Sequence, residues 1–382
     1  MAIAELSVAG YRSIRAMRLP LGRINVLTGP NGCGKSNLYN AVFLFAKAAG
    51  GGFARAIAEE GGMPSVMWAG AEKVRFTRRK PAARVKLAVT LDMFSYQLEC
   101  GLPQCGPPVE GGSAFLLDPE IKEESVSLSG GGRRTILMDR QGATAHLRDA
   151  DARLVRYPIA LYSSESVLAQ IQEPHLYPEL SALRAEMGQW RFYHQFRTDA
   201  GSPLRHPQIG VLTPVLAHDG GDLAAALQTI VEIGDADGMR EAVDRAFPGA
   251  TVEVVSDRTR FRVAMHMPGV LRPLEAGELS DGTLRYLCLV AALLSPRPPA
   301  LLALNEPETS IHPDLIGPLG ELITKASRKS QLWITTHSRT LAEAIERFSG
   351  EAPVRLRLED GETVVERAEG MIHGRGVGDA ET

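Results

Sequence analysis

A glycine-rich segment close to the start of this chain of 382 residues limits the folds that the chain can adopt. Residues 29–36 read GPNGCGKS and match the pattern G-x-x-x-x-G-K-[ST] at every fixed position. Residues 23–28 before the segment are rich in apolar and β-branched residues, which predicts a strand, and residues 37–45 after it predict a buried helix. A strand, a glycine loop and a helix in this order are typical of a parallel α/β sheet.

The same segment predicts a phosphate-binding loop, called the P-loop below. Its glycines allow backbone N–H groups to turn inward around a phosphate, and the start of the following helix adds positive potential. Lys35 would reach the β- and γ-phosphates, and the Ser36 hydroxyl would bind Mg²⁺. The competing interpretation, a glycine turn that happens to precede a helix, does not explain both flanks. The residues predicted to bind the nucleotide are Gly29, Pro30, Asn31, Gly32, Cys33, Gly34, Lys35, Ser36 and Asn37.

Two later segments predict buried strands that end in polar residues. Residues 299–305 are apolar up to their last position, as expected for a parallel strand covered on both faces, and residues 330–336 also predict a strand. Ligands bind beyond the carboxyl ends of such strands, which places Asn305, Glu306 and His337 near the phosphates. Glu306 would orient or deprotonate a water and His337 would sense the γ-phosphate. Taken singly, each of these residues is more simply explained as part of a solvated turn or of the structure.

A helix start provides a further signal. Ser280 precedes an apolar helical stretch over residues 284–294, so it is predicted to cap that helix and to leave backbone donors exposed.

Taken together and in this order, these segments resemble the ABC-type ATPases of the SMC/RecF-like branch, most closely its stand-alone bacterial AAA-family members. The P-loop resembles the Walker A motif, and residues 301–308 (LLALNEPE) resemble the Walker B motif. Residues 279–283 (LSDGT) resemble the signature motif, and residues 309–313 (TSIHP) resemble the D-loop. Residues 333–338 (WITTHS) resemble the strand that leads to the switch histidine. Residues 8–14 resemble the N-terminal strand and turn of that branch, where Arg12 would approach the nucleotide. The resemblance implies an α/β fold: a P-loop NTPase with an ABC-type ATPase head, in which helices flank a mixed central sheet, with an antiparallel β lobe and a small helical insertion.

The resemblance also implies a mechanism, which is ATP hydrolysis with Mg²⁺ in a head-to-tail homodimer. Ser280, Asp281 and Gly282 would act in trans on the partner's ATP, Glu306 and His337 would be catalytic, and Ser36 and Asn305 would hold the metal. The implied role is a regulator or clamp in DNA repair or genome defence, working with a protein effector. The alternative is a transporter-type energy module coupled to a membrane permease. A small-molecule kinase is a distant third possibility, since the signature helix would then have no purpose. No segment is assigned to the glutamine loop.

Asn305 departs from the superfamily pattern, which usually has Asp at this position. Asn keeps a carbonyl acceptor but lacks the negative charge, so Mg²⁺ should be held less tightly. This predicts a slow ATPase; the alternative is that Asn is simply tolerated in this group.

Glycine clusters punctuate the region between the P-loop and residue 280, so no heptad repeat of a coiled coil survives and a compact lobe is expected. Residues 74–77, 83–91, 94–99, 135–138 and 154–161 predict strands, helical spacing runs through 177–196, and alternation around Asp360-Gly361 predicts a hairpin. The expected segments are 1–175, the N-terminal half of the head with the P-loop and β lobe; 176–245, a helical arm; 246–350, the C-terminal half; and 351–382, the hairpin and tail.

The formal charge of −3 excludes a uniformly basic nucleic-acid-binding surface. A local cluster is a candidate DNA contact, although a hairpin with a solvated outer face explains it as well. The four cysteines fit neither a zinc site nor a disulfide framework, and the start of the chain does not resemble a secretory signal. The longest apolar run is too short for a membrane span, so we expect a cytoplasmic protein. The basic cluster comprises Lys73, Arg75, Arg78, Arg79, Lys80, Arg84 and Lys86.

Overall fold

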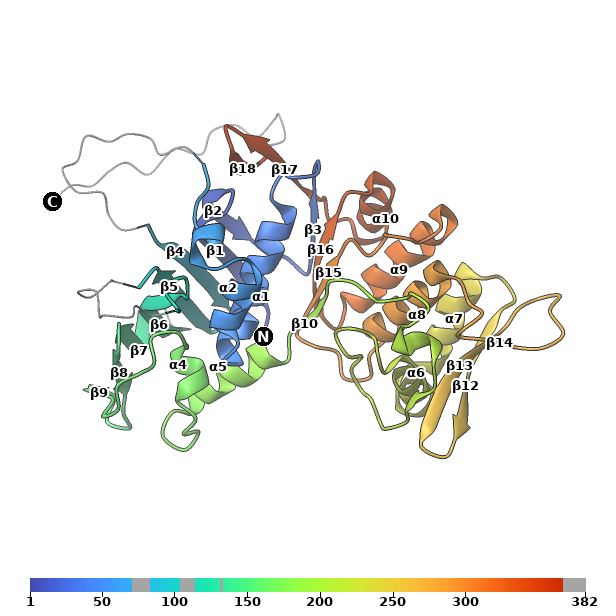
Figure 1. The fold of residues 1–382 in the computed structure, drawn as a ribbon, viewed down its shortest axis with the longest axis horizontal. Coiled ribbons are helices and arrows are strands. Elements are labelled where there is room, and N and C mark those ends of the chain that lie inside the picture. Colours follow the sequence, from blue (N-terminus) through green and yellow to red (C-terminus); the bar gives the residue numbers. More distant parts are fainter. Residues whose placement is uncertain (71–82, 104–113, 131–132, 367–382) are drawn as a thin grey trace.

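The computed structural model describes residues 1–70, 83–103, 114–130 and 133–366. Within these residues, a central sheet separates an antiparallel β lobe from a largely helical lobe (Figure 1). The order of the central sheet is β10 (Arg191–Tyr193), β15 (Leu301–Asn305), β16 (Gln331–Thr336), β3 (Ile24–Thr28), β17 (Val354–Glu359) and β18 (Glu362–Val365). The first five strands are parallel and β18 is antiparallel to β17. The expected mixed sheet, the predicted strands around both site segments and the predicted hairpin are confirmed.

Both faces of the central sheet are buried, which explains its continuous apolar strands. Along β15, Leu301 and Ala303 belong to one hydrophobic core, and Leu302 and Leu304 belong to the other. Neighbouring positions of a strand point to opposite faces, so a strand between two cores needs apolar residues at every position.

The antiparallel lobe is built on one face of the central sheet, and helix α1 (Lys35–Ala49) contacts both sheets. Helix α1 contacts α2 (Phe53–Glu59), α4 (Val167–Gln170) and α5 (Pro178–Gly188), and α2 contacts α3 (Met63–Val66). The lobe confirms the predicted strands at 83–91, 94–99 and 135–138; the strand predicted at 154–161 ends at Arg156, and residues 74–77 lie outside the described residues. The strand order is β2 (Ile14–Pro20), β1 (Ile3–Tyr11), β4 (Val85–Leu91), β5 (Phe94–Gly101), β6 (Glu120–Gly130), β7 (Arg133–Gln141), β8 (Thr144–Arg148) and β9 (Leu154–Arg156).

The other face of the central sheet is covered by helices and a small sheet (Figure 1). In the described part of the chain, no helix is long and apolar enough to cross a membrane. The helices are α6 (Leu223–Ile233), α7 (Ala236–Ala246), α8 (Asp281–Leu293), α9 (Ile316–Ala326) and α10 (Arg339–Ser349). The small sheet consists of β11 (Gln208–Ile209), β12 (Thr251–Asp257), β13 (Arg260–His266) and β14 (Leu274–Glu275), and short 3-10 turns lie at Pro203–Arg205 and Pro313–Leu315.

The helical spacing predicted through 177–196 is wrong in its second half. Helix α5 ends at Gly188, and Arg191–Tyr193 form β10, which pairs in parallel with β15. Phe192 of this strand is 1% exposed and packs edge-on against the rings of Tyr39 and Phe43. A three-residue strand is too short to show a period of its own, so the preceding helical pattern dominated the prediction. The expected helical arm thus contains one strand of the central sheet, while the four segment boundaries stay a prediction.

Candidate nucleotide-binding site

The P-loop connects β3 to α1 and uses glycine where other residues would not fit. Gly29, Gly32 and Gly34 have φ angles of 149°, 79° and 100°, values that L-residues rarely adopt. A Cβ atom on Gly34 would lie 2.1 Å from Thr363 Oγ1, and one on Gly29 would lie 2.2 Å from the Leu356 carbonyl oxygen. The loop is therefore shaped by its own backbone and by the C-terminal hairpin packed against it.

The side chains that follow the loop occupy different environments. Lys35 is 5% exposed, and its Nζ donates to the carbonyl oxygens of Gly29 at 2.7 Å and Pro30 at 3.1 Å. Ser36 is exposed, whereas Asn37 Nδ2 donates to Ser13 Oγ at 2.7 Å. The ammonium group of Lys35 is thus hydrogen-bonded to the backbone of the P-loop itself.

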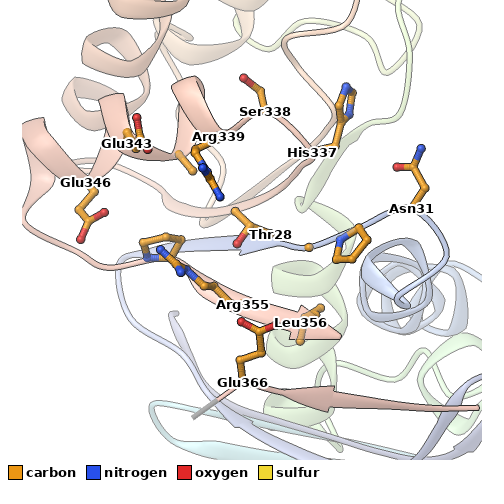
Figure 2. A pocket seen from close by; sticks show the side chains of 14 residues that line it. Thr28, Asn31, His337, Ser338, Arg339, Glu343, Glu346, Arg355, Leu356 and Glu366 are labelled. Atoms are coloured by element: carbon orange, nitrogen blue, oxygen red, sulfur yellow. The ribbon is translucent and has the colours of Figure 1, made fainter. Parts of the chain in front are cut away.

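A cavity of about 480 Å³ opens beside the first half of the P-loop. Figure 2 shows Asn31 and His337 at one end, with Arg339, Glu343 and Glu346 of α10 on one wall. The opposite wall comes from β17. The full lining is Thr28, Gly29, Pro30, Asn31, His337, Ser338, Arg339, Ala342, Glu343, Glu346, Pro353, Arg355, Leu356 and Glu366.

Asn305 and Glu306 lie at the carboxyl end of β15, as the sequence predicted. Asn305 Oδ1 accepts a hydrogen bond from Thr335 Oγ1 at 2.7 Å. An amide oxygen has two lone pairs, so one acceptor site remains for a metal or its water. Glu306 has a φ of 46°, a conformation that costs about 1–3 kcal/mol in a non-glycine residue. This turn places Glu306 Oε1 3.5 Å from His337 Nδ1.

The signature segment is exposed at the start of α8. Ser280 Oγ caps the helix by accepting from Thr283 N at 3.1 Å, as predicted. Arg205 holds the segment by donating to the carbonyl oxygens of Ala276, Gly277 and Leu279 and to the Asp281 carboxylate. Ser280, Asp281 and Gly282 are not among the described residues that line the P-loop cavity.

Behind its exposed end, α8 packs directly on the D-loop. Arg285 Nη1 donates to the Thr309 carbonyl oxygen at 2.7 Å. A Cβ atom on Gly282 would lie 2.6 Å from the Ser310 carbonyl oxygen, so glycine allows this close approach. The structure therefore joins the signature segment to the D-loop of the same chain.

Arg12 is held against the end of α2. Its φ is 48°, its Nη2 lies 2.6 Å from Glu60 Oε2, and Tyr11 OH donates to the same oxygen at 2.6 Å. Burial, with Glu60 as the next cause, raises the pKa of the Tyr11 hydroxyl well above its usual value. The approach of Arg12 to a nucleotide stays a prediction.

Sequence reasoning missed Gln195. This residue follows β10 and, with Asn305, Glu306 and Arg285, lines a second, smaller cavity. A glutamine two residues after the strand next to Walker B is the signal that would have found it, but that strand was not predicted.

The predicted basic cluster is only partly described. Lys73, Arg75, Arg78, Arg79 and Lys80 lie outside the described residues. Arg84 pairs with Glu123 at 2.6 Å and with Glu99 at 3.2 Å, and Lys86 pairs with Glu99 at 2.5 Å. These two cations are therefore balanced by carboxylates of neighbouring strands.

The site fits a metal that arrives with a nucleotide. Over the described ranges, no group of three or more His, Cys, Asp or Glu side chains could hold a metal alone. Mg²⁺ is commonly bound through one or two protein oxygens together with substrate phosphates and waters. The exposed Ser36 hydroxyl and the second lone pair of Asn305 Oδ1 suit this kind of site.

The parallel sheet with its P-loop, the antiparallel lobe and the helical lobe define an ABC-type P-loop ATPase fold of the SMC-like kind. Similar solved structures include an SmcHead bound to the C-winged helix domain of ScpA, with TM-score 0.56, 14% identity, and 96% of this chain and 98% of that chain covered. An Smc head domain with an extended coiled coil, bound to the C-terminal domain of ScpA derived from Pyrococcus furiosus, has TM-score 0.51 and 13% identity, with 96% of each chain covered.

Residues 142–343 match the sequence profile of the family described as "AAA domain, putative AbiEii toxin, Type IV TA system". This is more than half of the chain, so the protein belongs to this family. Among curated protein sequences, none matches it.

Proposed function

We propose that this protein binds and hydrolyses ATP, and that two copies complete each other's sites head to tail. The observation that carries the proposal is the separation of the two halves of the site. The P-loop, Glu306 and His337 are gathered at the carboxyl edge of the central sheet, whereas Ser280 lies exposed at the start of α8. A helix start with free N–H groups is suited to an anion, and a second copy would supply that anion.

Each residue then has a defined task. The P-loop N–H groups and Lys35 bind the phosphates, Glu306 orients the attacking water and His337 contacts the γ-phosphate. Ser36 and Asn305 would hold Mg²⁺, which neutralises charge on the phosphate oxygens when it is bound. Ser280, Asp281 and Gly282 of the partner subunit close the site, so charge that develops during transfer is stabilised only in the dimer.

Complementation between two defective variants tests this proposal. Lys35→Ala removes the P-loop cation, and Ser280→Arg blocks the signature end; each protein alone should lose ATPase activity. Mixed dimers contain one intact site, built from the P-loop of one copy and the signature of the other. Mixing equal amounts should therefore restore activity, up to about one quarter of the wild-type rate, since half of the dimers are mixed and each of these has one intact site.

Trapping the dimer provides the second measurement. Glu306→Gln should keep ATP binding, slow turnover at least about 100-fold and accumulate an ATP-dependent dimer seen by light scattering. A protein that turns over ATP as a monomer, or a mixture without recovered activity, would contradict the head-to-tail site.

For the biological role, we propose a regulator or clamp in genome defence or DNA repair that acts with a protein effector. The family description names a toxin of a type IV toxin–antitoxin system, which favours defence. The similar SMC heads are bound to ScpA domains, which favours a protein partner. No feature of the described residues favours a transporter-type module. Salt-dependent binding of duplex DNA to the Lys35→Ala protein, with and without charge reversal in residues 73–80, tests the DNA contact.

A further inference from the structure

A buried carboxylate, Glu308, lies between the D-loop and the loop that carries the switch histidine. Its side chain is 6% exposed. One oxygen, Oε1, accepts from Thr336 Oγ1 at 2.5 Å and from the backbone nitrogens of His337 and Ser338, each at 3.1 Å. A single carboxylate oxygen thus fixes three consecutive residues of the switch loop.

The same oxygen also faces the imidazole ring. His337 Nδ1 lies 3.4 Å from Glu308 Oε1 and 3.5 Å from Glu306 Oε1. Two carboxylates beside Nδ1 fix the orientation of the ring.

Helix capping does not account for Glu308. Helix α10 is already capped by Ser338 Oγ, which accepts from Leu341 N at 3.2 Å. The second carboxylate oxygen of Glu308, Oε2, is buried and makes no hydrogen bond with the described residues. A buried acceptor without a partner costs free energy, so stability alone is a poor reason for an acid at this position.

On its other side, Glu308 is connected to the signature segment. The next two residues, Thr309 and Ser310, are the ones whose carbonyl oxygens contact Arg285 and Gly282 of α8. A continuous path of contacts therefore runs from the exposed end of α8, through the D-loop and Glu308, to His337.

We propose that Glu308 is a positioning residue that sets His337 when the signature end of the same chain engages a partner. The inference rests on the proposed function, because only in a head-to-tail dimer is ATP bound at both the exposed end of α8 and His337. Glu308 thereby links the ATP held in trans by one chain to the ATP held by that chain's own P-loop.

The test compares Glu308→Gln with a matched control, Glu351→Gln. The amide keeps an acceptor oxygen for Thr336 and the two backbone N–H groups but removes the charge beside His337. Glu351 is an exposed carboxylate in the loop before β17 and lies outside the cavity lining. We expect Glu308→Gln to lower kcat about 10-fold with KM within about twofold, and Glu351→Gln to leave both unchanged.

A double-mutant cycle separates positioning from a structural role. If Glu308 acts through His337, Glu308→Gln should cause little further loss of kcat in a His337→Ala protein. An equal loss in both backgrounds, or an unchanged kcat in the single variant, would overturn the inference. Thr336→Val offers a second route, because it removes the shortest hydrogen bond to Glu308 and leaves the carboxylate in place; it should lower kcat about threefold or more.

The two proposals fail in different ways. Absence of ATP turnover by the wild-type protein and absence of complementation would reject the proposed function. Normal turnover and complementation, together with a Glu308→Gln protein that behaves like Glu351→Gln, would reject only the role of Glu308.

Discussion

Asn305 stands where the superfamily usually has Asp, and its contacts now define what the substitution changes. Its carbonyl oxygen accepts a hydrogen bond from Thr335 on the neighbouring strand. A carboxylate could keep this bond and add a negative charge beside the metal. Compared with Asp, the amide of Asn305 therefore reduces the negative charge at the site without disturbing the sheet.

Asn305→Asp should lower the Mg²⁺ concentration needed for half-maximal ATPase activity about threefold or more and raise the turnover rate. Titration of activity with Mg²⁺ at saturating ATP measures both effects, and Thr335→Val controls for loss of the hydrogen bond alone. An unchanged rate and Mg²⁺ dependence would mean that Asn is merely tolerated.

His194 gives a residue-scale prediction about pH. Its ring lies edge-on to Tyr39 and Phe43, with centroid separations of 4.7 and 4.9 Å. Burial, together with His218 and Lys47, lowers the pKa of His194 to about 4, below its usual value near 6.5. The unfolded chain therefore binds the proton more readily, so stability is complete above pH 6.5 and is lost as the pH falls toward 4.

The expected loss is about 1 kcal/mol between pH 7 and pH 5, a discounted value because the His194 side chain is exposed to solvent. Urea unfolding at the two pH values measures it, with His194→Gln and the exposed His206→Gln as a matched pair. The His194 variant should show a smaller pH effect than the wild type, and the His206 variant should not. Equal pH effects in all three proteins would assign the titration to another group.

At the scale of elements, the C-terminal hairpin supports the P-loop from outside. Strand β17 pairs in parallel with β3, and Thr363 of β18 donates its backbone N–H to the Ser13 carbonyl oxygen at 2.7 Å. The hairpin turn places Asp360 and Gly361 at φ angles of 48° and 82°, the left-handed pair expected of a two-residue hairpin turn.

The hairpin prediction uses two glycines with nearly the same backbone. Gly361 and Gly269 have φ angles of 82° and 81°, and neither has an atom closer than 4 Å to the position of an added Cβ. Substituting either by Ala should cost about 1 kcal/mol in unfolding free energy. Only Gly361→Ala should also weaken ATP binding, which calorimetric titration would show; equal affinities would mean that the hairpin does not shape the loop.

The sequence predicted the elements whose pattern is local. The P-loop, the strands before Asn305 and His337, and the Ser280 cap each rest on neighbouring residues, and the structure places them as expected. Strand β10 was missed because its pairing partner, β15, lies far along the chain, and the β12–β13 hairpin was missed although its two strands pair with each other.

The same distinction applies to the candidate site. Residue identity and spacing predicted Lys35, Glu306 and His337, whose chemistry is recognisable in one segment. Gln195 and the contacts of Glu308 became apparent only from the fold, because their partners lie far away in the sequence. Arg12 was predicted correctly as a turn residue, but its pairing with Glu60 depends on how α2 packs.

At the scale of the whole molecule, two hydrophobic cores share one sheet. One core joins α1 to the antiparallel lobe, and the other joins the central sheet to α6, α8, α9 and α10. The P-loop follows β3 and Glu306 follows β15, both strands of that sheet, and the signature segment lies at the start of α8 in the helical lobe (Figure 1). The arrangement connects the two halves of the proposed site through a shared sheet.

The pairing of β3 has a consequence for synthesis of the chain. This strand carries the P-loop, yet its two neighbours are β16 and β17, which begin more than 300 residues later. A polypeptide emerging from the ribosome therefore exposes its glycine loop long before either supporting strand exists. We therefore expect the loop to bind nucleotide only after almost all of the chain has been translated.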